Sequence, residues 1–192
     1  MILPLDQRPV IVALASSNGA GKTTFYHAHL QQSGLRLINA DILARELGLD
    51  AYGAAKMAGV LRQRLLEQRE SFVFETVFSD PSGDKLEFLK DAKKAGYAVV
   101  VIFIGIDDAE ISGDRVAMRV SQGGHDVPTE KLRQRYPRIM GNLKRALAEL
   151  ANVFVYDHSD LEAGYLLVAT REGGQQVELH GPTPDWLSRL LT

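Results

Sequence analysis

The stretch VIVALASSNGAGKTT at residues 10–24 joins an apolar run to a glycine-containing loop. The apolar run at residues 10–15 is rich in β-branched types and predicts a buried strand. A loop that follows a strand and ends in Gly-Lys-Thr is typical of a phosphate-binding loop (P-loop). Its backbone N–H groups and the N-terminus of the next helix form a concavity that binds anions. The stretch therefore predicts an α/β nucleotide-binding fold.

The loop matches the pattern Gly-x-x-x-x-Gly-Lys-Ser/Thr except at its first position, where Ser16 replaces glycine. Lys22 is expected to reach the β- and γ-phosphates of ATP, and the hydroxyl of Thr23 is expected to ligate Mg²⁺. The expected nucleotide-binding residues are Asn18, Gly19, Ala20, Gly21, Lys22, Thr23 and Thr24. The alternative is an ordinary strand-to-helix turn that carries a chance lysine.

The composition fits one compact domain over residues 1–192, of which 45% are hydrophobic. The formal net charge of -2 gives no general attraction to a polyanion, which argues against nucleic acid as the main partner. The absence of cysteine excludes disulfides and a cysteine nucleophile and fits a reducing compartment. The sequence shows neither a signal peptide nor an apolar stretch long enough for a membrane. We therefore expect a cytoplasmic protein with no membrane partner.

Apolar runs alternate with longer amphipathic segments, as in βα units around a parallel sheet flanked by helices. Further strands are expected at residues 35–39, 71–75, 97–104 and 153–156, and helices at residues 22–32, 51–69 and 81–94. A helix that Asp41 could cap is expected after the second strand. In the segment that follows Pro137, several apolar side chains fall on one helical face: Ile139, Leu143, Ala146, Leu147 and Leu150.

Two further segments have compositions of their own. Residues 107–138 are rich in charge and predict a helical lid over the loop, made of two helices joined at Gly123-Gly124. Pro137 is expected to kink or restart the second helix. Residues 164–180 predict a C-terminal β-hairpin that turns at Gly173-Gly174.

Polar residues that follow the expected strands are candidates for a site, because ligands of parallel sheets lie beyond the carboxyl ends of the strands. Asp41 could accept a proton from an attacking hydroxyl, or could simply cap a helix, and the sequence leaves both interpretations open. Glu75 and Thr76 end the third expected strand. A charged residue there indicates a polar role for Glu75, with an exposed strand terminus as the alternative.

The charged segment offers arginines for the transferring phosphate. Arg115 and Arg119 are four residues apart and share a helical face, and Arg135 lies between Lys131 and Arg138 at helical spacing on the next helix. Two such faces could clamp a triphosphate and exclude water. The alternative is a pair of solvated helices, because acidic residues balance the basic ones. His125 could contact a ligand or could be an exposed loop residue.

The motifs together resemble one known family. They are NGAGKTT at residues 18–24, NAD at 39–41, ETVFS at 75–79, RVAMRVSQGGHDVPTEKLRQRY at 115–136 and NL at 142–143. In order and spacing this set resembles the zeta-toxin-like P-loop kinases, from about residue 10 to residue 159. The segment at residues 115–136 is the specific part, because a P-loop alone fits many families.

The resemblance implies about five parallel strands with a helical lid, and ATP-dependent phosphorylation of a sugar hydroxyl on an activated sugar such as UDP-N-acetylglucosamine. It implies Asp41 as the base, Glu75 and Thr76 as substrate contacts, and Arg119 and Arg135 as the phosphate-stabilising arginines. Arg115 is the reserve for the first arginine. In the lid, the Gly-Gly-His sequence that ends at His125 resembles one branch of the family, for which the nucleotide-sugar acceptor is implied less strongly than for the toxins proper.

The sequence thus predicts a small-molecule kinase that uses Mg²⁺ and ATP, with a nucleotide sugar as the leading acceptor. An antitoxin protein is a partner that the resemblance allows. One alternative is a P-loop ATPase or nucleotide-dependent switch that acts through a protein partner. The other is a kinase of nucleic-acid ends, for which the near-neutral chain offers no basic groove.

Overall fold

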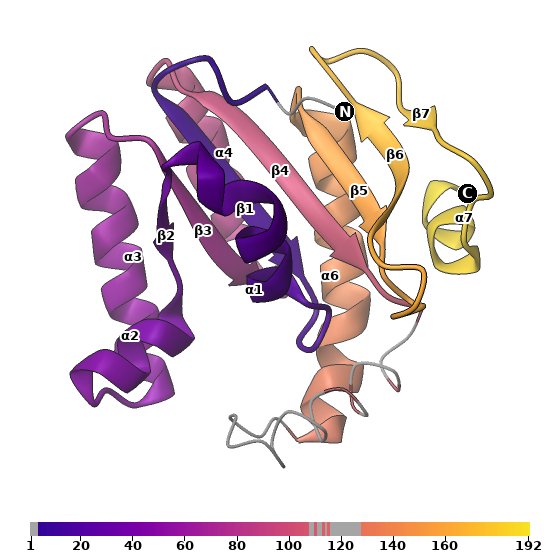
Figure 1. Cartoon of the computed structure of the whole chain (residues 1–192), viewed down its shortest axis with the longest axis horizontal. Helices are drawn as coiled ribbons and strands as arrows, with labels where there is room; N and C mark the ends of the chain where they lie inside the picture. Colours follow the sequence, from indigo (N-terminus) through magenta and orange to yellow (C-terminus); the bar gives the residue numbers. More distant parts are fainter. Residues whose placement is uncertain (1–3, 108–109, 111–112, 114, 116–127) are drawn as a thin grey trace.

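The protein is built on a seven-stranded sheet with the order β2-β3-β1-β4-β5-β6-β7 (Figure 1). The computed structural model describes residues 4–107, 110, 113, 115 and 128–192. The strands are β1 (Val10–Ser16), β2 (Arg36–Ile38), β3 (Phe72–Val77), β4 (Ala98–Gly105), β5 (Val153–Asp157), β6 (Leu166–Arg171) and β7 (Glu178–Leu179). Strands β1 to β5 pair parallel with one another, whereas β6 pairs antiparallel with β5, and β7 pairs antiparallel with β6. The predicted α/β fold with a central parallel sheet is confirmed.

The helices complete two layers around this sheet. They are α1 (Lys22–Phe25), α2 (Ala40–Leu47), α3 (Ala51–Glu67), α4 (Asp84–Lys94), α6 (Thr129–Glu149) and α7 (Asp185–Leu191). Helix α1 continues without a break into a π-helical turn (Tyr26–Leu30) and a 3₁₀ turn (Gln31–Ser33). Helices α4 and α6 cover one face of the sheet, and α1 covers the other (Figure 1).

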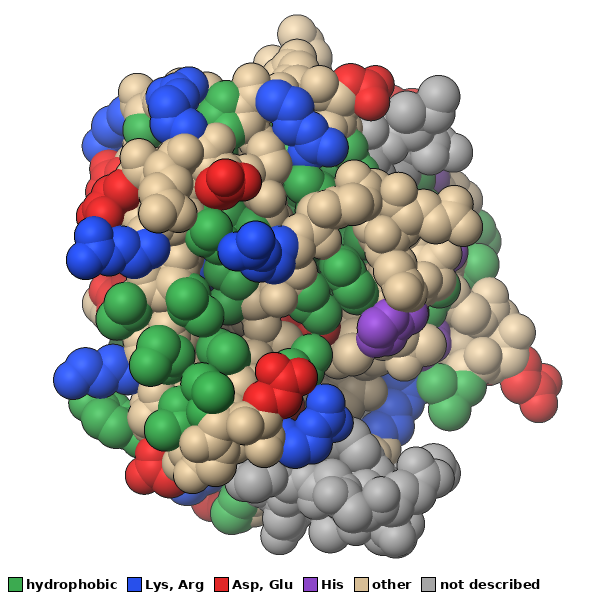
Figure 2. All heavy atoms as spheres, turned by 60° about the vertical axis from the view of Figure 1, so that its left-hand side comes forward, with side chains coloured by type: hydrophobic (Ala, Val, Ile, Leu, Met, Phe, Trp, Pro, Cys, Tyr) green, Lys and Arg blue, Asp and Glu red, His purple; other side chains and the backbone are tan. Residues whose placement is uncertain are grey.

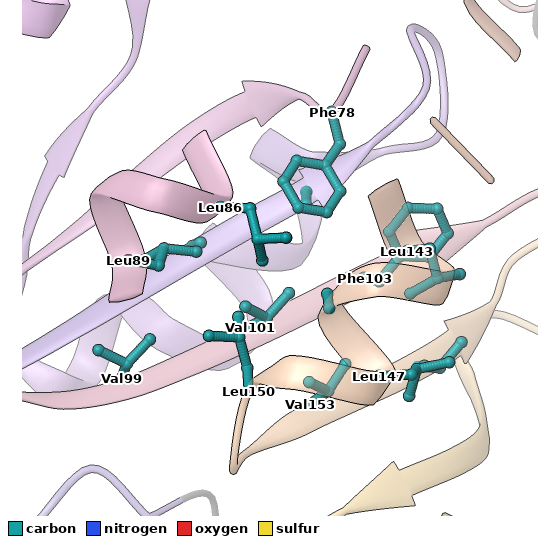
Figure 3. Close-up of a cluster of buried hydrophobic side chains, with 14 of the residues drawn as sticks. Phe78, Leu86, Leu89, Val99, Val101, Phe103, Leu143, Leu147, Leu150 and Val153 are labelled. Carbon is teal, nitrogen blue, oxygen red and sulfur yellow. The ribbon is translucent and has the colours of Figure 1, made fainter. Parts of the chain in front are cut away.

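The core follows the alternation of the central strands. In β1, Ile11 and Ala13 pack with α4 and α6, whereas Val12 and Leu14 pack with Phe25 and the other residues of the α1 side. Because both faces are covered, every residue of β1 is buried, as expected for a central parallel strand. Figure 3 shows the first of these layers, in which Leu86 and Leu89 of α4 and Leu143 and Leu147 of α6 lie against Val99 and Val101 of β4 and against Val153 of β5.

Helix α6 differs from its prediction in continuity. It is one helix from Thr129 to Glu149 that includes Pro137 and neither ends nor restarts there. Pro128 is its N-cap residue. The helix therefore runs from the segment predicted as a lid directly into the core, where Ile139 and Leu143 are buried. The other predicted lid helix falls mostly outside the described residues.

Two C-terminal features extend the sheet and cover its end. Strands β6 and β7 pair antiparallel at residues 169–170 and 178–179, within the segment where the sequence predicts a hairpin. Helix α7 was not predicted. Its Trp186 packs against Gly105 so closely that a Cβ on Gly105 would collide with the indole ring, and the indole N–H donates to Asp157 Oδ1 at 2.8 Å.

The surface on the α2–α3 side carries exposed apolar side chains. Leu47, Tyr52, Met57 and Val60 are exposed there, and Figure 2, which brings this side forward, shows hydrophobic side chains gathered among charged ones. This surface adjoins β2, the first strand of the sheet. Among the residues that the structure describes, no helix is long and apolar enough to cross a membrane.

Candidate functional site

A pocket of about 320 Å³ opens at the carboxyl ends of β1, β2 and β3. It is lined by Asn18, Gly19, Gly21, Lys22, Thr23, Thr24, Asn39, Ala40, Asp41, Glu75, Thr76, Val77 and Arg115. The fold therefore brings together most of the site residues that the sequence predicts. Ala20, which is part of the loop, is fully buried, whereas Arg119 and His125 lie outside the described residues.

The P-loop needs glycine at Gly21 for two reasons. Gly21 is the N-cap of α1 and has a φ of 92°. This left-handed backbone conformation is unfavourable for residues other than glycine. A Cβ on Gly21 would also lie 2.6 Å from the Tyr165 hydroxyl. The backbone can therefore turn here into the helix and leave the N–H groups of the loop available to a phosphate.

Two side chains from beyond β5 support this loop from outside the pocket. His158 Nδ1 lies 2.9 Å from the Ala20 carbonyl oxygen, and the Tyr165 hydroxyl donates to the Gly21 carbonyl at 2.7 Å. The two rings stack with their centroids 4.0 Å apart. Because a carbonyl only accepts, His158 carries a proton on Nδ1. Burial lowers the pKa of His158 and so favours its neutral form.

The sequence analysis missed this support. His158 follows β5 at the same edge of the sheet as Asp41 and Glu75, so the rule that selected those residues would also have selected it. Tyr165 directly precedes β6, which is antiparallel to β5. The search for polar residues after the carboxyl ends of parallel strands therefore could not have selected it.

Lys22 lies against the start of its own loop. Its ammonium group donates to Ser16 Oγ at 2.8 Å and to the Ser17 carbonyl at 3.0 Å. The Ser16 hydroxyl in turn donates to the Ser17 carbonyl at 2.6 Å. The serine that departs from the P-loop pattern thus supplies a hydrogen-bond acceptor for the lysine that the pattern requires.

Asp41 lies in the first turn of α2 but does not cap it. The N-cap is Asn39, whose Oδ1 accepts from the backbone N–H groups of Asp41 at 2.7 Å and of Ile42 at 3.2 Å. The interpretation of Asp41 as the helix cap is therefore wrong. Its carboxylate lines the pocket, and the role as base stays a prediction.

Glu75 is held inside β3, which continues to Val77, so the alternative of an exposed strand terminus is wrong. Its Oε2 accepts from Thr23 Oγ1 at 3.2 Å, and its Oε1 is buried with no hydrogen-bond partner of good geometry in the described part of the chain. Burial raises the pKa of this carboxyl above its ordinary value. The charge of Lys22 and hydrogen bonding to Thr23 and Asn39 oppose that rise.

Two of the predicted arginines reach the site. Arg115 donates from its two terminal nitrogens to the carbonyls of His158 and Ser159, each at 2.8 Å, and burial lowers its pKa. Arg135 of α6 donates to Asn18 Oδ1 in the P-loop at 3.3 Å. Both are partly buried, so neither belongs to a solvated helix face, whereas Lys131 and Arg138 are exposed.

The strand order and the loop together define a class. A parallel sheet with its P-loop after the central strand β1, and a pocket at the strand ends, is the fold of P-loop kinases. The Zeta toxin family matches residues 51–166, more than half of the chain, and the chain belongs to this family. The match begins after the P-loop, so the loop and the family match are independent observations.

The chain is similar to several known proteins. An uncharacterised protein of Haemophilus influenzae is 29% identical over 125 residues, which are 62% of this chain and 87% of that protein. The PezAT toxin–antitoxin structure from Streptococcus pneumoniae has a TM-score of 0.61 at 19% identity, over 80% of this chain and 70% of that one. A gluconokinase from Sinorhizobium meliloti has a TM-score of 0.52 at 16% identity, over 80% and 85%. At these identities the two structures share the fold.

Proposed function

We propose that this protein transfers the γ-phosphate of ATP to a hydroxyl of a small acceptor, most specifically a nucleotide sugar such as UDP-N-acetylglucosamine. Membership of the Zeta toxin family supports the phosphotransferase activity. The observation that carries the proposal is that Asp41 shares one pocket with Lys22 and Thr23 and is relieved of helix capping by Asn39. The nucleotide sugar as acceptor rests on the resemblance of the sequence motifs.

The loop residues bind and orient the nucleotide. Backbone N–H groups of the P-loop surround the phosphates, and Lys22 exchanges its contacts with Ser16 and Ser17 for phosphate oxygens. The Thr23 hydroxyl and the Glu75 carboxylate are hard oxygen donors side by side, which fits Mg²⁺. When bound, Mg²⁺ neutralises charge on the β- and γ-phosphates. Thr23 is the residue we expect to hold it.

The transfer itself needs a base and cations. Asp41 accepts the proton of the acceptor hydroxyl as its oxygen bonds to the γ-phosphorus. The bond from phosphorus to the β–γ bridging oxygen breaks, and ADP leaves. Arg135, which already reaches Asn18, stabilises the charge of the transferring group, and Arg119 is proposed for the same task from the resemblance.

The remaining predicted residues are proposed as acceptor contacts. Thr76 and Arg115 line the pocket and offer a hydroxyl and a guanidinium to a sugar or its phosphates. His125 is proposed as a further contact from its place in the lid sequence. A cytoplasmic location and an antitoxin as protein partner complete the proposal, the latter supported by the family and by the PezAT toxin–antitoxin system.

The deciding experiment is ATP turnover with and without UDP-N-acetylglucosamine, followed by mass spectrometry of the sugar. We expect the sugar to gain one phosphate with the wild type and none with Asp41→Asn. ATP hydrolysis that no sugar affects would favour the switch that acts through a protein. Transfer to a 5′-hydroxyl oligonucleotide, with binding that weakens as salt rises, would favour the nucleic-acid-end kinase.

A further inference from the structure

Helix α6 carries Arg135 on the same face as a buried asparagine. Arg135 and Asn142 are seven residues apart, about two helical turns, so they lie on one face of the helix. The Asn142 Nδ2 donates to the carbonyls of Phe78 and Asp80, each at 3.0 Å. These carbonyls belong to the segment that directly follows β3. A buried amide group that donates to two backbone carbonyls fixes the helix at this point.

The segment after β3 also contacts the start of the P-loop. The backbone N–H of Phe78 donates to the Ser16 carbonyl at 3.3 Å, and the Phe78 carbonyl accepts from Asn142. The ring of Phe78 is buried in the layer that β3 forms with α4 and α6 (Figure 3). One short segment therefore connects α6 to the same loop that Arg135 contacts at Asn18.

A second contact holds the N-terminal part of α6. The Tyr136 hydroxyl lies 3.1 Å from the Ile106 carbonyl and 2.8 Å from the Asp107 carbonyl, and both residues directly follow β4. Pro137 lies between Tyr136 and the buried asparagine and has no N–H with which to continue the hydrogen bonding of the helix. The helix is therefore weakened between its two contacts. The asparagine alone does not fix the turn that carries the arginine.

We propose that Tyr136 and Asn142 are positioning residues, which hold α6 on the carbonyls after β4 and β3 and so keep Arg135 against the P-loop. This rests on the proposed function, in which Arg135 stabilises the transferring phosphate. An arginine is most effective on the charge of a transition state when its guanidinium is already in place. Both positioning side chains bond to backbone carbonyls, and they act on the transfer through Arg135.

The test is a double-mutant cycle on phosphate transfer from ATP to UDP-N-acetylglucosamine. Tyr136→Phe removes only the hydroxyl and should lower kcat by about 10–100-fold, because a displacement of about 1 Å can cost about 10²-fold. The KM for ATP should change little. In an Arg135→Ala background, Tyr136→Phe should have no further effect on kcat, because it acts through that arginine. Asn142→Ala should follow the same pattern with a larger loss of stability.

Tyr97→Phe is the matched control. The Tyr97 hydroxyl also contacts backbone carbonyls, those of Leu65, Leu66 and Glu70 at 3.1–3.2 Å, but Tyr97 directly precedes β4, at the edge of the sheet opposite to the pocket. Its loss should lower the free energy of unfolding and leave kcat unchanged. Circular dichroism checks the fold of each variant. The proposal is overturned if Tyr136→Phe lowers kcat equally in the wild-type and Arg135→Ala backgrounds, or no more than Tyr97→Phe does.

A second measurement needs no acceptor. Hydrogen–deuterium exchange of residues 129–136, followed by mass spectrometry, should be faster in Tyr136→Phe than in the wild type and unchanged in Tyr97→Phe. Unchanged exchange of this segment in Tyr136→Phe would also overturn the proposal. If the wild type transfers no phosphate to the sugar, the proposed function itself fails, and the exchange measurement still decides whether Tyr136 holds the helix.

Discussion

The two sides of the pocket are stabilised in different ways. The phosphate side, residues 16–24, is supported by His158 and Tyr165, which lie 138 and 144 residues beyond the loop carbonyls that they contact. The carboxylate side, residues 39–41 and 75–77, contains the Asn39 cap, whose partners lie two and three residues away. One side depends on the assembled sheet and the other largely on a local turn. Substitutions on the two sides should therefore affect different properties: phosphate transfer on the carboxylate side and ATP binding on the phosphate side.

The largest effect is expected on the carboxylate side, at Asp41. Asp41→Asn removes the proposed base without changing the size of the side chain. The rate of phosphate transfer should fall by about 10²–10⁴-fold, the usual contribution of a general base. The dissociation constant of ATP should stay near that of the wild type, because the phosphate side is intact. Phosphate transfer at nearly the wild-type rate in Asp41→Asn would show that Asp41 is not the base.

On the phosphate side, Gly21→Ala should affect nucleotide binding. The added Cβ would lie 2.6 Å from the Tyr165 hydroxyl, at a backbone φ of +92°. We expect weaker ATP binding and a loss of about 1–3 kcal/mol in the free energy of unfolding from the strained backbone alone. Calorimetry of ATP binding and denaturant unfolding measure the two effects.

Gly34→Ala is the matched control for that experiment. Gly34 also has a positive φ, +71°, but nothing lies within 4 Å of an added Cβ. It should therefore lose stability from the backbone conformation and keep ATP affinity. Equal loss of ATP affinity in both variants would show that crowding against Tyr165 is not what matters.

The sequence predicts the carboxylate side better than the phosphate-side support, and the reason is physical. Strands β1 and β4 are buried on both faces, so their apolar runs are continuous and easy to recognise. Asp41 follows β2 and Glu75 lies near the end of β3, and both strands bring their polar residues to the edge of the sheet that the P-loop marks. The contacts of His158 and Tyr165 with the loop depend on the placement of β5 and β6 beside β4, which no local pattern encodes.

Two local predictions were overturned, one by a residue two positions away in the chain and the other by tertiary packing. The cap of α2 was assigned to Asp41 as one alternative, although Asn39 is the residue with the extended backbone that a cap requires. Helix α6 passes through Pro137 because its apolar face is packed against the sheet on the C-terminal side of the proline. Tertiary packing thus outweighs the local preference of proline.

A smaller effect is expected at Asn39, which stabilises the first turn of α2 through contacts with residues two and three positions away. Asn39→Ala removes the acceptor for two backbone N–H groups and should cost about 0.5–2 kcal/mol in the free energy of unfolding. Transfer activity should fall because the first turn of α2 positions Asp41. Asn39→Ser keeps a capping oxygen and should recover most of the stability. Equal stability of the alanine and serine variants would show that the cap does not hold this turn.

The smallest effect is a pH dependence of stability at Glu75, the residue that joins the two sides through Thr23. Burial raises its pKa above the ordinary value of 4.5, so the folded protein holds this proton more tightly than the unfolded chain. Stability is therefore lost as the pH rises from the unfolded pKa through the folded pKa, because the charged form is disfavoured only in the fold.

Glu75→Gln cannot titrate and escapes this loss. Measured without nucleotide or metal, its unfolding temperature relative to the wild type should be higher at neutral pH than at pH 4. Thr76→Val is the control, and its difference from the wild type should not change with pH. A Glu75→Gln difference that is equally independent of pH would mean that Lys22, Thr23 and Asn39 fully offset the burial of the carboxylate. The contacts between the two sides of the pocket would then stabilise the charged carboxylate already in the absence of ligand.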